Sequence, residues 1–339
     1  MRLVQVSARE SASRLALAVI SAAVLAVSGC SVLGGSGAGG GQLTVGIMPG
    51  IDTAPLRIGI QDGLFRDHGL DVVVKTYTSL QAEFQALKSG SVDVAVGDYA
   101  DFFYEDAVGK ASLHLIADGY DAASNTMEVL ALPGSGITTP QALDNKVVAT
   151  PEPQLIPSLN GSYTTDTVPY SLETLATESV LGSDGVTPTG VTWKPTPSQD
   201  MIRELRSGQV SAILATEPYI IQAESQLGAI EVMDSCSGIT ANLPLSGYFS
   251  LAAFSQAHSA QLQQFRAALT SAQADAANRG PLQTVLPHFT GMTSQDADLV
   301  TFGSFPTSLG VGQIQRVADL MYTSGLISNP LSVSRMAGG

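Results

Sequence analysis

Cysteine, tryptophan and basic residues are scarce in this sequence. Its 339 residues include 2 cysteines and 1 tryptophan, and 16 Lys and Arg stand against 30 Asp and Glu, for a formal net charge of −14. A nucleic-acid-binding surface needs clustered Lys and Arg to contact phosphates, so we expect no nucleic-acid partner. Two cysteines are also too few for a thiolate metal cluster, and we expect no metal site.

Local signatures of catalysis are missing as well. The sequence contains no H-E-x-x-H, P-loop, G-x-S-x-G or C-x-x-C motif, and each of these would place reactive groups at a fixed spacing. The four histidines stand far apart, at positions 68, 114, 258 and 288. We therefore expect a protein that is not an enzyme and that holds no cofactor.

The N-terminus has the pattern of an exported lipoprotein. Basic residues precede the apolar run LALAVISAAVLAV at 15–27, which is shorter than the roughly 20 residues of a membrane-spanning helix. The run ends in VSGC at 27–30, which resembles a bacterial lipobox. We expect residues 1–29 to be a signal peptide and Cys30 to carry the lipid that anchors the protein to the outer face of the cytoplasmic membrane. The alternative is an ordinary secretory signal with a chance cysteine.

A flexible tether follows this cysteine. Residues 31–42 read SVLGGSGAGGGQ, a Gly/Ser composition that cannot form a core. The segment formally contains G-x-G-x-x-G, but a dinucleotide-binding loop must follow a strand and open a helix. We therefore assign residues 30–42 to the lipidated cysteine and a spacer.

From residue 43 onward, strand and helix patterns alternate. LTVGI at 43–47 and LDVVV at 70–74 read as strands, and the segment at 54–69 carries apolar residues at helical spacing. Strands separated by amphipathic helices form parallel sheets covered on both faces, which predicts an α/β fold. A chain of this length more often forms two domains than one.

An internal repeat indicates that the two domains are similar. Residues 78–99, TSLQAEFQALKSGSVDVAVGDY, align without gaps to 196–217, TPSQDMIRELRSGQVSAILATE. Both copies begin with Thr-x-x-Gln, which we interpret as a capping box at a helix start, and both pass through Ser-Gly into a strand. We predict two similar α/β lobes with parallel-rich sheets. The alternative is a pair of ordinary helix–strand units in one larger sheet.

Turn-rich segments set the predicted lobe boundaries. ALPGSGITTPQAL at 131–143 and NLPLSGYFSL at 242–251 each leave a strand through Pro and Gly. If the chain crosses between the lobes at both places, lobe 1 comprises residues 43–131 plus 245–339 and lobe 2 comprises 132–244. The apolar stripes of the C-terminal helices then require lobe 1 to cover them.

Ligands of open α/β sheets bind beyond the carboxyl ends of the strands, and this rule selects the candidate binding residues. Each has a plainer alternative: Asp98 and Thr78 as helix caps, Glu217 in a first helical turn, and Trp193 as a core residue. Three tyrosines are included because they could stack on a ligand. The predicted ligand-binding residues are Asp52, Thr53, Thr78, Asp98, Tyr99, Tyr120, Thr150, Trp193, Thr216, Glu217 and Tyr248.

Several of these segments resemble one family. The Ala-Pro-Leu at 54–56, the Gly-Leu-Phe turn at 63–70 and the Gly-x-Val-Asp at 90–93 are similar to motifs of the substrate-binding proteins of ABC transporters for aliphatic sulfonates, nitrate, taurine and thiamine precursors. ITTPQALDNKVVAT at 137–150 and ILATEPY at 213–219 resemble second-lobe segments of the same family. The resemblance implies a type II periplasmic-binding-protein fold, a ligand held between two lobes, and an ABC permease with its ATPase as partner.

The predicted cleft departs from that family in its charge. Arg57 stands where family members usually have an aromatic or aliphatic residue, and Asp52, Asp98 and Glu217 have no obvious basic partner. A simple oxyanion would lack compensating donors. A neutral or amino-bearing organic molecule, for instance a pyrimidine held by carboxylates and stacked on Tyr or Trp, fits better.

Two other functions remain open at this point. An enzyme on the same fold is one, since the eukaryotic thiamine-pyrimidine synthases resemble these binding proteins; they carry a cysteine-rich motif and a reactive histidine that this sequence lacks. A sensory protein that presents its ligand to a membrane receptor is the other. In the leading interpretation the protein is a monomeric, lipid-anchored solute-binding protein.

Overall fold

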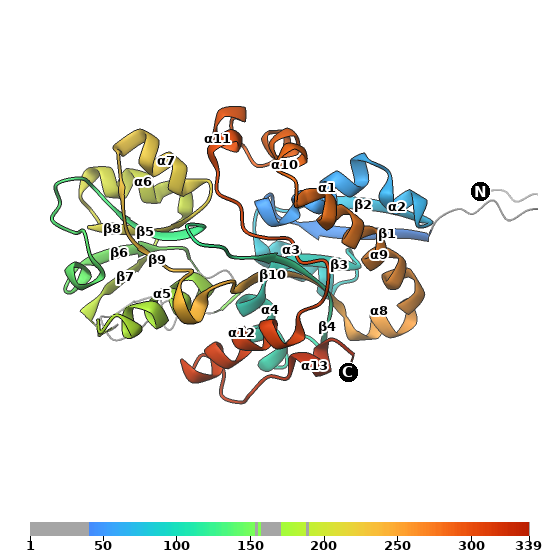
Figure 1. The fold of residues 1–339 in the computed structure, drawn as a ribbon. Helices are drawn as coiled ribbons and strands as arrows, with labels where there is room; N and C mark the ends of the chain where they lie inside the picture. The colour runs from blue at the N-terminus through green and yellow to red at the C-terminus, as the bar shows by residue number, and fades with distance from the viewer. Residues whose placement is uncertain (1–40, 153–154, 157–170, 188–189, 339) are drawn as a thin grey trace, which may run out of the picture. The chain divides into compact units, whose positions relative to one another are not determined.

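The computed structural model describes residues 41–152, 155–156, 171–187 and 190–338 (Figure 1). The predicted signal peptide at 1–29, the lipidation site Cys30 and most of the tether lie outside these residues. Strand β1 begins at Gly41, within the predicted tether, because its pairing with β2 starts there. Within the described part of the chain, no helix is long and apolar enough to cross a membrane.

The first sheet has the strand order β2-β1-β3-β10-β4. Strands β2, β1 and β3 run parallel, and β10 is antiparallel to both of its neighbours. The strands are β1 (Gly41–Ile47), β2 (Leu70–Thr76), β3 (Val94–Asp98), β4 (Leu113–Asp121) and β10 (Pro244–Leu251). The helices between them are α1 (Ala54–Gln61), α2 (Leu64–Asp67), α3 (Leu80–Lys88) and α4 (Tyr99–Ala107).

The second sheet repeats this plan in the order β7-β6-β8-β5-β9, with α5 on one face and α6 and α7 on the other (Figure 1). Its strands are β5 (Met127–Ala131), β6 (Val147–Thr150), β7 (Thr192–Pro195), β8 (Ala212–Thr216) and β9 (Ile230–Asp234). Its helices are α5 (Leu172–Ser183), α6 (Ser198–Ser207) and α7 (Tyr219–Leu227). The prediction of two α/β lobes is confirmed, and the alternative of one larger sheet is wrong.

The two copies of the internal repeat occupy equivalent places. Strand β3 pairs in parallel with β1, and β8 pairs in parallel with β6. The predicted capping boxes are wrong, because each helix starts later than the Thr-x-x-Gln pattern indicated. Ser79 caps α3 by accepting a hydrogen bond from the Ala82 amide at 3.3 Å, while α6 follows Pro197 and has no side-chain cap.

The chain crosses between the sheets twice. Strand β5 pairs with β8 and β9, so the first crossing lies between Asp121 and Met127, earlier than the predicted boundary at 131. The second crossing lies between β9 and β10, next to the predicted boundary. The Ala122 amide donates to the Leu243 carbonyl at 2.9 Å, which ties the two crossing segments together.

Helices from the C-terminal part of the chain cover the first sheet. Helix α9 packs on α1 and α2, where Phe65 and Phe265 stack at 5.3 Å between ring centroids. Helix α12 packs on α4 and β10, and α13 packs on β4. These helices are α8 (Ala252–Ala257), α9 (Ser259–Ala276), α10 (Arg279–Val285), α11 (Ser294–Leu299), α12 (Val311–Thr323) and α13 (Val333–Met336). Single-turn 3-10 helices span Ile51–Thr53, Pro140–Leu143, Gly238–Thr240 and Leu286–His288.

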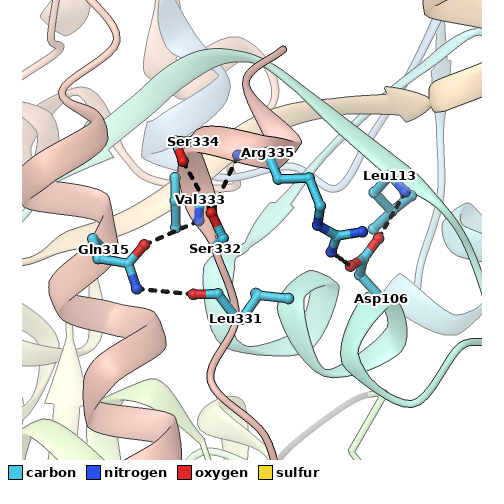
Figure 2. Close-up of polar contacts among 8 residues, drawn as sticks. All are labelled: Asp106, Leu113, Gln315, Leu331, Ser332, Val333, Ser334 and Arg335. Atoms are coloured by element: carbon cyan, nitrogen blue, oxygen red, sulfur yellow. Dashed lines mark hydrogen bonds and ion pairs between the residues drawn. The ribbon is translucent and has the colours of Figure 1, made fainter. Parts of the chain in front are cut away.

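The last helix is held in place by polar contacts from two directions (Figure 2). On one side, Gln315 of α12 donates to the Leu331 carbonyl at 2.9 Å and accepts from the Val333 amide at 3.0 Å. On the other, Arg335 pairs with Asp106 of α4 at 2.7 Å. Gln315 therefore provides hydrogen-bond partners for two backbone groups at the start of α13, which would otherwise have to bond to water.

We predict that Gln315→Ala lowers the free energy of unfolding by about 1–3 kcal/mol, because it leaves backbone groups of the docked segment without partners. Chemical denaturation monitored by circular dichroism measures the loss. The control is Gln256→Ala, an exposed helical glutamine, which should change stability by less than about 0.5 kcal/mol. Equal losses in the two variants would contradict the role given to Gln315.

Candidate functional site

A cavity of about 800 Å³ lies between the two sheets, where strand ends and helix starts of both lobes converge. The loop after β1 contributes residues 48–52, the end of β3 contributes residues 96–98, and the end of β8 with the residue that follows it contributes 216–217. The starts of α3, α5 and α6 also line the cavity. Because the ends of parallel strands meet at one edge of a sheet, two sheets facing each other in this way enclose a site that neither forms alone.

The structure brings six of the predicted binding residues together in the lining of this cavity. They come from both sheets and from the loops that follow their strands. These residues are Asp52, Thr78, Asp98, Tyr120, Thr216 and Glu217. The rule that ligands bind at the carboxyl ends of strands therefore located the cavity correctly.

Two predicted threonines do not line the cavity. The Thr53 hydroxyl donates to the Gly50 carbonyl at 2.8 Å and holds the turn after β1. Thr150 is buried at the end of β6, where its hydroxyl lies 2.6 Å from that of Thr174. Thr53 therefore supports the turn after β1, and Thr150 joins the end of β6 to helix α5.

The aromatic residues Tyr99, Tyr248 and Trp193 also lie away from the cavity. Asp98 ends β3 and lines the cavity, whereas Tyr99 begins α4 and points into the core, where its hydroxyl donates to Asp118 at 2.7 Å. Tyr248 packs against Phe265 of α9 at 5.8 Å. The Trp193 side chain is a core residue, 5% exposed, and donates to Glu178 at 2.9 Å.

Asp98 and Glu217 form helix-end hydrogen bonds and line the cavity as well. Asp98 is the N-cap of α4, and its Oδ1 accepts from the amides of Ala100 at 2.7 Å and Asp101 at 3.3 Å. Glu217 Oε2 accepts from the Ile221 amide in the first turn of α7 at 3.3 Å. Capping and cavity lining are therefore not exclusive alternatives for these two carboxylates.

Sequence reasoning missed several lining residues, notably Asp101, Glu173 and Ser246. Asp101 and Glu173 lie in the first turns of α4 and α5. Acidic residues are common there because they interact favourably with the helix dipole, so that position alone does not mark a binding residue. A signal was available for Asp101, which lies three residues after the predicted Asp98 and hence on the same helix face.

Two carboxylates link the lobes across the cavity. Asp101 of the first lobe accepts from the amides of Leu155 at 2.9 Å and Ile156 at 3.3 Å, in the segment that follows β6. In the opposite direction, Glu217 of the second lobe accepts from the Thr301 amide at 3.1 Å, in the C-terminal segment that packs on the first sheet. Each lobe thus contributes one acceptor to a backbone donor of the other.

All charged side chains among the described lining residues are acidic. These residues include six carboxylates and no Lys, Arg or His; the carboxylates are Asp52, Asp98, Asp101, Glu152, Glu173 and Glu217. Among all described residues, no group of three or more His, Cys, Asp or Glu is arranged to hold a metal ion. The lining can therefore accept hydrogen bonds and balance positive charge.

Burial shifts the protonation of these groups. It raises the pKa of Asp98 well above 3.8, and the neighbouring carboxylates of Glu173 and Asp101 raise it further. Burial also raises the pKa values of Glu173 and Asp52. Asp98 and Glu173 belong to different lobes, so ionisation of Glu173 in one lobe makes ionisation of Asp98 in the other less favourable.

Two α/β sheets that share a cavity, joined by two chain crossings, define the periplasmic-binding-protein fold. The chain belongs to the NMT1-like family, whose model matches residues 37–283. No curated protein sequence matches the chain significantly.

Solved structures share this fold at low sequence identity. The periplasmic aliphatic sulphonate binding protein SsuA from Escherichia coli superposes with a TM-score of 0.68 at 18% identity, over 87% of this chain and 97% of that one. The periplasmic nitrate-binding protein NrtA from Synechocystis PCC 6803 has a TM-score of 0.65 at 13% identity, over 88% of this chain and 85% of that one. The desulfurization enzyme DSZB has a TM-score of 0.62 at 13% identity, over 88% of this chain and 96% of that one.

The single tryptophan supplies an internal probe of the second lobe. Burial raises the pKa of Glu178, the acceptor for the Trp193 indole, to about 7, and the hydrogen bond from Trp193 partly offsets this rise. We predict that tryptophan emission changes with a midpoint near pH 7 in the wild-type protein and not in Glu178→Gln. Glu224→Gln, which changes an exposed glutamate of α7, should retain the transition.

The same shift predicts how stability depends on pH. The pKa of Glu178 is higher in the folded state than its ordinary 4.5, so the contribution of the neutral form to stability is complete below about pH 4.5 and is lost as pH rises through about 7. Thermal unfolding should therefore show a smaller loss of stability over this range in Glu178→Gln than in wild type. A loss of equal size would contradict the assignment.

Proposed function

We propose that the protein is a lipid-anchored, extracytoplasmic solute-binding protein, which captures a small organic molecule between its two lobes and delivers it to an ABC importer. The observation that carries this proposal is the cavity of about 800 Å³ lined by both lobes, a volume within the range of small-molecule sites. Its partners would be an ABC permease and the associated ATPase, and it would act as a monomer. The likeness to sulphonate-binding and nitrate-binding proteins supports the transport role.

A ligand would favour closure of the two lobes, because both lobes contribute residues to the cavity lining. A ligand shifts an equilibrium between open and closed forms only by its preference for one of them. The cavity lining comes from both lobes, so a bound molecule would gain contacts on closure. The hydrogen bonds of Asp101 and Glu217 across the cavity would form in the same movement, and a permease could recognise the resulting surface.

We assign ligand contact to the six predicted residues that line the cavity. Asp52, Asp98 and Tyr120 would act from the first lobe, and Thr216 and Glu217 from the second. Thr78 would contribute from the turn before α3. In this assignment lobe 1 comprises the first sheet with the C-terminal helices, and lobe 2 the second sheet with α5, α6 and α7.

An enzyme is the second candidate, because DSZB shares the fold. The described residues of the cavity lining include no Cys or His to act as nucleophile or base. Cys236 is buried, and burial raises the pKa of its thiol to about 12, which leaves it protonated and unreactive at neutral pH. These features favour binding over turnover.

A thermal-shift screen tests the proposed function. The purified chain from residue 30 onward is heated with alkanesulfonates, nitrate, amino acids and pyrimidines. We predict that at least one solute raises the unfolding temperature, and that the rise grows with concentration as expected for binding to the folded state. Mass spectrometry should recover the solute unchanged after prolonged incubation; chemical conversion would favour the enzyme.

Membrane anchoring has a separate test with a matched control. Cys30→Ala should abolish incorporation of labelled palmitate and release the protein from the membrane fraction. Cys236→Ala changes the only other cysteine, which is buried in the second lobe, and should leave labelling and fractionation as in wild type. Retention of Cys30→Ala in the membrane fraction would contradict lipid anchoring at that residue.

A further inference from the structure

The charge of the cavity lining points to the class of molecule it takes. Building on the proposed function, we propose that the solute is an organic cation with N–H donors, such as an ammonium, amidinium or guanidinium group. Asp98 of the first lobe and Glu173 of the second would hold the cationic group, and Ser246 would accept one of its hydrogen bonds.

The described lining residues offer no basic side chain to balance an anionic ligand: they include six carboxylates and no Lys, Arg or His. The ion pairs among the described residues involve Glu105, Glu204, Asp200 and Asp106, all outside the lining. An anion in this cavity would be buried among like charges at a high cost in free energy.

Helix starts can bind an anion through their free amides, and at three of the helices that line the cavity a side chain already accepts from some of these amides. Ser79 accepts from the Ala82 amide at the start of α3, and Ser171 accepts from the Thr174 amide at the start of α5. Asp98 accepts from two amides at the start of α4. Helix α6 has no side-chain cap, so its first amides remain donors at the edge of the cavity. Apart from such amides, the charged groups of the described lining are all carboxylates.

Ser246 supplies an acceptor that does not depend on the acidic residues. It stands opposite Asp98 in the antiparallel register of β10 and β3, and opposed residues project from the same face of a sheet. Its side chain lines the cavity and the residue is 6% exposed. The hydroxyl lies beside Asp52, whose pKa it lowers, yet its oxygen makes no hydrogen bond of good geometry with a described residue.

Asp98 and Glu173 line the cavity from different lobes. When both carboxylates are ionised they repel each other, which opposes closure in the absence of a cation. A cation between the two carboxylates would convert that repulsion into attraction in the closed form alone. Such a ligand has the preference for one conformation that a ligand-driven closure requires.

A series of matched probes tests the charge of the ligand. Benzamidinium, benzamide and benzoate share one ring and carry positive, zero and negative charge. We expect benzamidinium to bind at least about tenfold more tightly than benzamide by calorimetry, since hydrogen bonds to ionised groups are roughly twice as strong as neutral ones. Benzoate should not bind.

Charge-neutral variants test the residues. Asp98→Asn keeps a cap at α4, because asparagine caps helices as well as aspartate does, and Glu173→Gln keeps the side-chain size. Each variant should reduce the ratio of benzamidinium affinity to benzamide affinity by about tenfold. Each should also raise the unfolding temperature of the ligand-free protein at about pH 8, because it removes repulsion between the two carboxylates. Glu224→Gln, outside the lining, should change neither quantity.

The outcomes separate this inference from the proposed function. Tighter binding of benzoate or an alkanesulfonate than of benzamidinium overturns the cation proposal and leaves solute binding intact. Failure of benzamidinium to bind also overturns it, whereas another solute stabilising the protein would keep the proposed function. If no solute in either set stabilises the wild-type protein, both proposals fail.

Discussion

The placement of β10 between β3 and β4 is the constraint on which the fold and the cavity both depend. This strand follows the second sheet in sequence but completes the first, where it pairs antiparallel with both neighbours. Its position obliges the chain to cross between the lobes twice and returns the C-terminal helices to the first lobe. It also sets the site, because the β3–β10 register places Ser246 opposite Asp98. A slip of β10 by one residue would turn Ser246 away from the cavity while Asp98 of β3 stayed in place.

The acidic cavity is compatible with a stable fold because backbone amides compensate part of its charge. Asp98, Asp101 and Glu217 each accept hydrogen bonds from amides, and such bonds to ionised groups are stronger than those to neutral ones. The compensation is incomplete, since burial still raises the pKa values of Asp98 and Glu217. The remaining cost of desolvation is what a bound positive charge would offset.

The sequence predicted those features that depend on local periodicity. Alternating strand and helix patterns, together with the repeat at 78–99 and 196–217, defined two α/β lobes because each unit carries its own signals. Helix starts were less accurate: Thr78 and Ser79 are adjacent and both can cap a helix, so local chemistry does not choose between them. The sheet that β5 joins is decided by pairing with β8 and β9, which are distant in sequence.

The binding residues show the same division between local and long-range information. Strand ends located six lining residues, but whether a side chain there faces the cavity or the core also depends on packing inside its own lobe. Tyr99 and Trp193 are core residues because each is buried within its own lobe and donates to a partner there, whereas Glu173 lines the cavity from the start of α5. Asp98 and Glu173 line one cavity only because the two lobes meet there, so no pattern within either lobe could have indicated that they share a site. A ligand held between residues of both lobes would in turn stabilise the arrangement that brings them together.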